Sequence, residues 1–251
     1  MKLQIKKIIG KLFGVKTTVD SSDLKGYVNY DYGFTLKFLP KCGSTSVLRM
    51  LYELENGVPF DREFDGRIHR WAKTKKLAPM SNVKRRIIII RDPVKRFLSA
   101  YSNRVIDKKQ LSKMYVEEKA PLVFPEIRHF NPTITQFIDE FEVYNKVSII
   151  RHHTAPICDF IKPWSLDYFT DVIPMERISM IEDVMSDIFN CKAVLGRAHV
   201  SEKKIRLSDL SEQCLNKILD FYSEDYECLA DYYTKDALIH EWKAGNKQRE
   251  I

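Results

Sequence analysis

Residues 34–46 read Phe-Thr-Leu-Lys-Phe-Leu-Pro-Lys-Cys-Gly-Ser-Thr-Ser, and this stretch decides the fold. Its apolar first half, Phe34 to Leu39, predicts a strand that runs directly into a turn. Beyond the turn, apolar residues recur on one face of a helix that should end near Asn56-Gly57, namely Val47, Leu48, Leu51 and Leu54. The stretch therefore predicts a strand, a tight turn and a helix.

A second unit of the same kind begins at Arg86, where an unbroken run of isoleucines is typical of a strand covered on both faces. Asp92 is the expected N-cap of the next helix and Pro93 its first residue. The apolar face of that helix should carry Val94, Phe97, Leu98, Tyr101 and Val105. Two strand-to-helix units in one chain predict a parallel sheet.

Weaker patterns follow these two units. They predict strands at 147–150 and 166–169, and amphipathic helices at 134–141, 180–189 and 211–233. The sequence contains no repeats and no dividing linker, so we expect a single domain over residues 1–251. Within it we expect a basic amphipathic extension at 1–30 and a catalytic core at 34–240. The predicted fold class is α/β, a three-layer, P-loop-like domain whose central, mainly parallel sheet is flanked by helices.

Composition narrows the class of protein only in part. The 251 residues are 44% hydrophobic, enough for one sizeable core, and 41 Lys and Arg against 34 Asp and Glu give a charge of +7. This excess suits a polyanionic ligand, an acidic glycan, nucleic acid or an anionic membrane. Five widely spaced cysteines indicate neither a disulfide framework nor a zinc site, so we expect no metal and a reducing compartment.

The first residues alternate lysines with short apolar steps and contain neither the apolar core of a signal peptide nor a run of about 18 apolar residues. We therefore expect a cytoplasmic protein. The basic segment either packs on its own domain or contacts an anionic membrane peripherally. The sequence does not reveal the oligomeric state.

The turn after the first strand has the chemistry of an anion site. Backbone N–H groups at a helix N-terminus are unpaired and attract phosphate. Gly43 permits close approach of a ligand, Lys41 adds a full charge, and Ser44, Thr45 and Ser46 add hydroxyl donors. The lysine precedes the only glycine, so the segment departs from the G-x-x-x-x-G-K-[ST] loop of nucleoside-triphosphate enzymes.

The turn after the second strand offers another anion site. Arg91 supplies a guanidinium fork at the end of a buried strand, and Ser99 supplies a hydroxyl two turns into the next helix. Ligands of open α/β sheets bind outside the carboxyl ends of the strands, where both turns should lie. Two anion sites in one crevice predict a nucleotide with separated phosphates.

These segments carry a resemblance to a known family. Phe38-Leu-Pro-Lys-Cys-Gly-Ser-Thr-Ser resembles the 5'-phosphosulfate-binding motif of the Golgi-type carbohydrate sulfotransferases, and Ile90-Arg-Asp-Pro-Val-Lys-Arg-Phe-Leu-Ser-Ala-Tyr resembles their 3'-phosphate-binding motif. This is the "sulfotransferase 2" group, which is related to the chondroitin, dermatan and 2-O-sulfotransferases. The resemblance extends more weakly to residues 153–156 and to the tyrosine-rich C-terminal helix.

The resemblance implies transfer of a sulfuryl group from 3'-phosphoadenosine 5'-phosphosulfate (PAPS) to a sugar hydroxyl without a metal. By motif position, the donor would be bound by Lys41, Cys42, Gly43, Ser44, Thr45, Ser46, Arg91 and Ser99. A loop that closes over the nucleotide in this family would add Ser201, with Lys203 or Arg206 as alternatives. Because a membrane anchor is missing here, the chain resembles a soluble, bacterial relative, and a Golgi location is not carried over.

Sulfuryl transfer develops negative charge on the leaving phosphate oxygen, so Lys41 is the catalytic cation that we expect beside it. The acceptor hydroxyl also needs a base. His69 is the first candidate, because the catalytic histidine of the related 2-O-sulfotransferases also lies between the two nucleotide motifs. His152, His153 or a carboxylate remain alternatives for this role.

The densest basic region begins at Arg67 and Arg70 and surrounds Trp71. It continues through Lys73, Lys75, Lys76, Lys84, Arg85 and Arg86. It either lines an acceptor groove, with Trp71 against a sugar ring, or forms a solvated loop. The predicted acceptor-binding residues are Arg67, Arg70, Trp71 and His153. A kinase or other phosphoryl-transfer enzyme and a nucleic-acid-binding protein are the alternative functions, although no nucleic-acid-binding module is recognisable.

Overall fold

The computed structural model describes residues 26–61, 68–72, 83–162, 164–196 and 204–247. Its strands are β1 (Tyr27–Asn29), β2 (Phe34–Lys37), β3 (Arg85–Ile90) and β4 (Asp171–Pro174). The helices of the first half are α2 (Ser44–Asn56), α3 (Ile68–Ala72), α4 (Pro93–Tyr101), the π-helix η2 (Ser102–Asp107), α5 (Lys113–Lys119) and the 3-10 helix η3 (Phe124–Glu126).

The second half of the chain is mostly helical. Its α-helices are α6 (Ile134–Asp139), α7 (Phe141–Tyr144), α8 (Ser148–Thr154), α9 (Ile157–Ile161), α10 (Met180–Phe189), α11 (Glu212–Phe221), α12 (Ser223–Cys228) and α13 (Lys235–Lys247). Short 3-10 helices complete it: η4 (Leu166–Tyr168), η5 (Met175–Arg177) and η6 (Leu207–Asp209).

The strands form one sheet in the order β1-β2-β3-β4. β1 is antiparallel to β2, whereas β2, β3 and β4 are parallel. Lys37 pairs with Ile88, and Ile90 pairs with Pro174. The carboxyl ends of the parallel strands therefore meet at one edge of the sheet, where the segments after β2, β3 and β4 lie together.

β3 is the central strand and explains why the sheet is covered on both faces. Ile87, Ile88, Ile89 and Ile90 are all buried, although successive side chains of a strand point to opposite faces. The surrounding core takes residues from the sheet and from α2, α3, α9 and α10. This arrangement confirms the predicted α/β fold with a mainly parallel sheet between helices.

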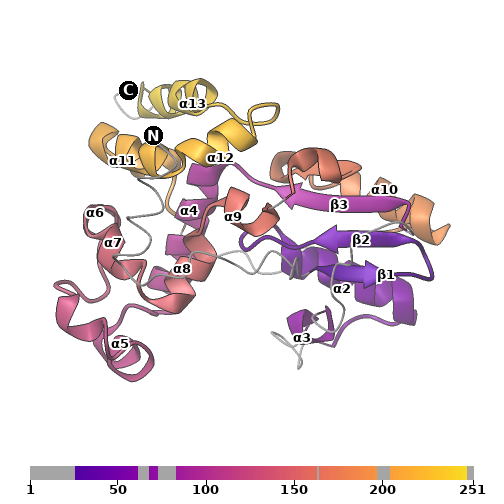
Figure 1. The fold of residues 1–251 in the computed structure, drawn as a ribbon, viewed down its shortest axis with the longest axis horizontal. Coiled ribbons are helices and arrows are strands. Elements are labelled where there is room, and N and C mark those ends of the chain that lie inside the picture. Colours follow the sequence, from indigo (N-terminus) through magenta and orange to yellow (C-terminus); the bar gives the residue numbers. More distant parts are fainter. Residues whose placement is uncertain (1–25, 62–67, 73–82, 163, 197–203, 248–251) are drawn as a thin grey trace, which may run out of the picture.

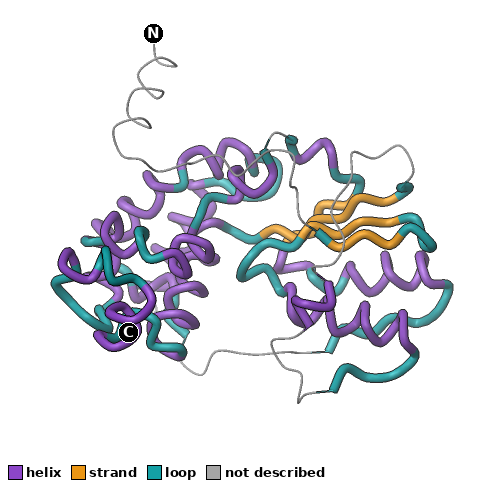
Figure 2. Tube along the Cα trace, turned by 60° about the horizontal axis from the view of Figure 1, so that its bottom comes forward, coloured by secondary structure: helices purple, strands orange, loops and turns teal. Residues whose placement is uncertain are grey.

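A second core cluster lies away from the sheet, among α4, α6, α8 and α11. Figure 1 shows the sheet on one side of the molecule and these helices on the other, with α4 running from the sheet into the helical half. Figure 2 shows the same division, with the strands gathered at one end. α4 thus belongs to both halves and starts at the edge where the parallel strands end.

The local predictions hold best around the two strand-to-helix units. α2 ends at Asn56 with Gly57 as its left-handed C-cap, and α4 begins at Pro93 with Asp92 as its N-cap. The Asp92 carboxylate accepts a hydrogen bond from the backbone N–H of Lys95 at 3.0 Å. The helix expected at 180–189 is also confirmed, and that at 211–233 is divided into α11 and α12.

Both weaker strand predictions are wrong. Residues 148–154 form α8, because Val147, Ile150 and Thr154 bury one helical face against the second core cluster and this packing overrides the β-branched composition. Residues 166–168 form a 3-10 turn, and the strand starts only at Asp171. His152 and His153 therefore lie at the end of a helix and not at the end of a strand.

None of the described helices is both long and apolar enough to cross a membrane. The basic N-terminal segment, 1–25, lies outside the described residues.

Candidate functional site

The segment from Phe38 to Gly43 links β2 to α2 and bends sharply twice. Lys41 and Gly43 both have positive φ, 68° and 70°. A Cβ atom at Gly43 would lie 2.5 Å from Cδ1 of Ile178 and 3.3 Å from Sδ of Met175. Gly43 is thus required for both its backbone conformation and the space around it. It also has no side chain to cap α2, whose first turn therefore presents its N–H groups at this edge of the sheet.

Lys41 is a largely buried cation in this turn. Burial, together with the positive charges of Arg104 and Arg91, lowers its pKa to about 8, while Asp107 acts in the opposite direction. A lysine in this position lowers the stability of the ligand-free protein, because its charge is desolvated and lies near other cations. An anionic ligand would restore the balance of charge.

Arg91 joins the second turn to the first. One of its terminal nitrogens donates a hydrogen bond to the backbone carbonyl of Lys41, with an N to O distance of 3.1 Å. Burial lowers the pKa of Arg91, and the nearby Glu176 partly opposes this effect. The two predicted anion-binding turns therefore form one continuous surface. Ser99 lies farther along α4, partly buried in its second turn.

Tyrosines from the C-terminal segment, Tyr226 in α12 and Tyr233 between α12 and α13, secure this edge of the sheet, and no sequence pattern predicted an individual role for them. The Tyr226 hydroxyl donates to the Asp92 carboxylate at 3.0 Å, and the Tyr233 hydroxyl donates to Glu176 at 2.7 Å. Both bonds connect the segments that follow β3 and β4 to the end of the chain. The only hint in the sequence was the density of tyrosines between 222 and 233.

His69 lies beside the first turn, as its predicted role requires. Its Nε2 atom is 3.2 Å from Oγ1 of Thr45, in the first turn of α2. Its neighbour Ile68 is fully buried in the sheet core and anchors α3 there. Sequence separation alone could not establish this contact. The structure brings His69, Thr45 and the Lys41 turn together, whereas its role as base stays a prediction.

The other predicted acceptor residues have varied surroundings. Arg70 is exposed. Trp71 packs against the sheet core, with its ring stacked on Tyr27 at 5.3 Å and edge-on to Tyr52 at 5.4 Å between centroids. These are the contacts of a packing residue, and a sugar-binding role for Trp71 stays a prediction. Arg67 and Ser201 lie outside the described residues.

Two described residues of the basic region, Arg85 and Arg86, lie far from the Arg91 turn. Arg85 and Arg86 lie at the amino end of β3, roughly 20 Å along the strand from Arg91. The Arg85 guanidinium pairs with Asp171 at 2.7 Å, and the Arg86 guanidinium lies 5.3 Å from the centre of the Tyr168 ring. Arg85 and Arg86 therefore stabilise the end of the sheet opposite the Arg91 turn. An acceptor groove lined by the basic region stays a prediction, as does the alternative of a solvated loop. Residues 73–82 lie outside the described residues.

His153 is buried at the end of α8, only 8% exposed. Burial, together with the charges of Arg104, His152, Lys41 and Arg96, lowers its pKa to about 2. The imidazole is therefore neutral near pH 7. The fully buried Arg96 donates to the backbone carbonyl of His153 at 3.1 Å, which fixes this end of α8. Direct contact of His153 with an acceptor stays a prediction.

Arg104, which the sequence analysis passed over, belongs to the same group of cations. It lies on η2 one helical turn beyond Ser99, and its charge lowers the pKa of both Lys41 and His153. The signal in the sequence was its place in the helix that begins with the second motif. Hydrophobic periodicity pointed to the adjacent Val105 and gave no weight to Arg104.

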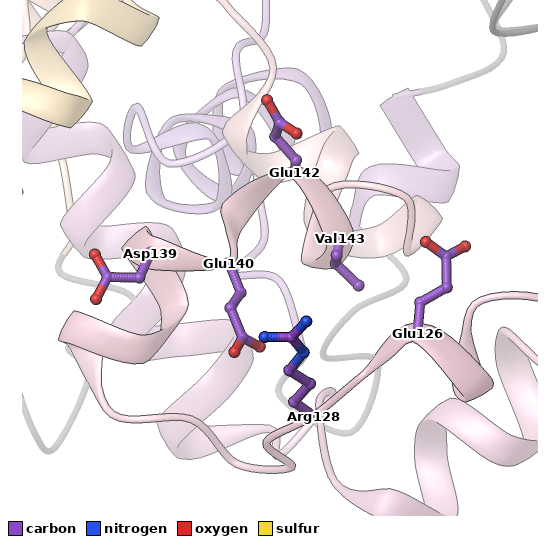
Figure 3. Close-up of a pocket in the computed structure, with 6 residues that line it drawn as sticks. All are labelled: Glu126, Arg128, Asp139, Glu140, Glu142 and Val143. Atoms are coloured by element: carbon purple, nitrogen blue, oxygen red, sulfur yellow. The ribbon is translucent and has the colours of Figure 1, made fainter.

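A pocket of about 390 Å³ opens elsewhere, among η3, α6 and α7. Figure 3 shows its mostly acidic lining, with the Arg128 side chain directed toward Glu140: Glu126, Arg128, Asp139, Glu140, Glu142 and Val143. No predicted site residue lines it, and its carboxylates would repel an anionic nucleotide. In the described part of the chain, no group of three or more His, Cys, Asp or Glu residues is arranged to hold a metal ion.

Comparison with known proteins agrees with the geometry of the two turns. No curated protein and no solved structure matches the chain. Residues 27–233, which include both turns, α3 and the C-terminal tyrosines, match the Sulfotransferase family. This match favours neither a kinase nor a nucleic-acid-binding protein. The chain thus belongs to the sulfotransferase family and is an enzyme that transfers sulfuryl groups.

Proposed function

We propose that the enzyme takes the sulfuryl group from PAPS and transfers it to a hydroxyl of a carbohydrate. The observation that carries this proposal is the hydrogen bond from Arg91 to the Lys41 carbonyl, which joins two cationic turns at one edge of the sheet. A donor with a 5'-phosphosulfate and a separate 3'-phosphate has the charge distribution that such a pair can bind. Membership of the family supports the same donor.

The residues fit this donor by their charge and by the space at the turn. Lys41 and the first turn of α2 would hold the 5'-phosphosulfate, together with the backbone and hydroxyl groups of residues 42–46. Arg91 and Ser99 would hold the 3'-phosphate. Gly43 leaves free the position where a side chain would crowd Ile178 and the turn. Lys41 is partly buried, and no carboxylate among the described residues is bonded to it, which favours an anionic ligand.

In the proposed reaction, the acceptor oxygen forms a bond to sulfur while the bond from sulfur to the 5'-phosphate oxygen breaks. Lys41 and the N-terminus of α2 stabilise the charge that develops on that phosphate oxygen. His69 takes the proton of the acceptor hydroxyl. Its Nε2 atom already faces Thr45 at 3.2 Å, so an acceptor hydroxyl that replaces this contact would meet the base beside the donor.

A carbohydrate acceptor rests on the family resemblance and on the exposed Arg70 next to His69. A guanidinium at this position would suit a sugar that carries carboxylate or sulfate groups. No step in the proposed reaction requires a metal, because protein cations stabilise the leaving group.

Binding of 3'-phosphoadenosine 5'-phosphate (PAP), the product of the donor, tests the proposal. Saturating PAP should raise the melting temperature, since a ligand at a hundred times its Kd stabilises a protein by about 2.7 kcal/mol. ATP and ADP at the same concentration should have a much smaller effect, because they lack the 3'-phosphate. Equal shifts with ATP and PAP would contradict the assignment of the donor.

A further inference from the structure

Among the described residues, no ion pair links Arg104 to an acidic side chain that would account for its position. It lies on the π-helix η2, a wide turn of the kind that often marks functional sites, where it continues α4 beyond Tyr101. Its guanidinium is partly buried, and burial lowers its pKa. Its Nε atom is buried and makes no hydrogen bond in the described part of the protein. A buried donor without an acceptor costs free energy, so it suggests a ligand that supplies one.

Two basic side chains, Lys41 and His153, interact electrostatically with Arg104. Arg104 and His153 line the same small internal space, and the Nδ1 atom of His153 is also buried without a hydrogen bond among the described residues. Among the charged groups, Arg104 has the largest effect on the pKa of Lys41 and on that of His153, and it lowers both. Asp107, at the other end of η2, opposes the effect of Arg104 on Lys41 but ranks below both arginines, so positive charge prevails around Lys41.

Arg91 and Arg104 approach Lys41 in different settings. The groups that shift the pKa of Arg91 most, after burial, are Cys42, Glu176 and Asp92, at the edge of the sheet. Arg104 instead lies with His153, between α4 and α8. Lys41 is the residue that both arginines affect. A ligand group bound to Lys41 would thus have Arg91 toward the sheet and Arg104 toward the helical half.

We propose that Arg104 is a third cationic ligand of the donor and that it binds the 5'-phosphosulfate end together with Lys41, not the 3'-phosphate. The proposal rests on the proposed function, because it names an additional ligand for the same nucleotide. The neutral ring of His153, which lines the same internal space, would then help to position the Arg104 guanidinium.

The test is isothermal titration of Arg104→Gln with PAPS and with adenosine 5'-phosphosulfate, which lacks the 3'-phosphate, both without acceptor. A lost charged hydrogen bond should weaken binding of each ligand by roughly tenfold to a hundredfold. The ratio of the two dissociation constants, for adenosine 5'-phosphosulfate and for PAPS, should stay the same as in the wild type. Lys108→Gln is the matched control, because it removes the same charge from an exposed residue four positions away and should leave both affinities unchanged.

Each outcome decides a different point. If Arg104→Gln binds both ligands as tightly as Lys108→Gln does, Arg104 is no ligand of the donor. If only PAPS binding falls, the guanidinium contacts the 3'-phosphate and the assignment to the 5' end is wrong. If the wild type itself binds neither PAPS nor PAP, the proposed function fails and not this inference alone.

A second variant guards against loss of folding. Arg104→Lys keeps the charge and most of the volume, so it should fold and retain part of the affinity for both ligands. A second measurement needs no ligand: the rate at which an amine-reactive reagent labels Lys41, followed by mass spectrometry. Arg104→Gln should slow this labelling near pH 8, because removal of a neighbouring cation raises the pKa of Lys41. Unchanged labelling of Lys41 and unchanged donor affinity in Arg104→Gln, compared with the wild type, would together overturn the proposal.

Discussion

The guanidinium of Arg91 donates a hydrogen bond to the backbone carbonyl of Lys41, 3.1 Å away, and so connects two turns that lie far apart in the sequence. Each turn follows a parallel strand, and the pairing of β2 with β3 places both at the same edge. Arg91 therefore has two tasks in the proposed site. It holds the backbone of the first turn, and its remaining N–H groups would bind the 3'-phosphate of the nucleotide.

Arg91→Lys should weaken binding of PAP by roughly tenfold or more, because one ammonium group cannot hold the Lys41 carbonyl and a phosphate as a fork does. The melting temperature should change little. Arg86→Lys is the control, since it replaces a guanidinium at the other end of the same strand. Titration of PAP into both variants checks the prediction, and equal affinity in the two would contradict it.

Gly43→Ala should lower both stability and donor affinity. The left-handed backbone costs an L-residue about 1–2 kcal/mol, and the added Cβ would also crowd Ile178. Gly57→Ala is a matched control at the other end of α2, with φ of +69° but nothing within 4 Å of the added atom. Urea unfolding and PAP titration should show a larger loss for Gly43→Ala. Equal losses would mean that the crowding at Gly43 has no effect.

Lys41→Met should raise the melting temperature of the free protein while it abolishes PAP binding. The buried cation is unfavourable in the fold, which is why its pKa falls to about 8 from the ordinary value of 10.5. Each kcal/mol recovered should add roughly 2–4 °C in a protein of this size. Thermal unfolding at pH 7 measures the change, and a lower melting temperature with unaltered PAP binding would contradict it.

The same pKa predicts how binding depends on pH. Lys41 is charged in the free protein below about pH 8 and neutral above it, so PAP affinity should fall as the pH rises through 8. The unfolded chain holds this proton up to about 10.5, so the Lys41 contribution to stability increases between pH 8 and 10.5. PAP titrations from pH 7 to 10 measure the first effect. Affinity that stays constant across this range would rule out a charged Lys41 as donor ligand.

His69→Gln should lower turnover by roughly a hundredfold to ten-thousandfold while PAP affinity stays nearly the same, as expected for a base that acts on the acceptor. His152→Gln, at an exposed position of α8, is the control and should keep full turnover. The measurement is the rate of sulfuryl transfer at saturating PAPS. Loss of turnover in His152→Gln and not in His69→Gln would move the role to α8.

The parts predicted from the sequence are those governed by local rules. The isoleucine run specifies β3, Asp92-Pro93 specifies the start of α4, and the Lys41 to Ser46 turn follows from the strand and helix around it. Each depends on neighbours within a few residues, through burial, capping and backbone conformation. Parallel pairing then follows from the two strand-to-helix units.

Other parts depend on contacts between distant segments. Residues 147–150 have the composition of a strand, but they form α8 because a helical face packs on the second core cluster. Arg85 and Arg86 look like part of one basic surface until β3 places them at the opposite end from Arg91. The approach of Arg104 to Lys41 needs the path of η2 in space, which hydrophobic periodicity does not describe.

The most direct test is transfer of radiolabelled sulfuryl from PAPS to a panel of glycans in the presence of EDTA. The proposed joining of two cationic turns around the donor predicts labelled product from the wild type, and almost none from Lys41→Ala or Arg91→Ala although both variants remain folded. Full transfer by both variants, or transfer that stops when EDTA is added, would contradict it.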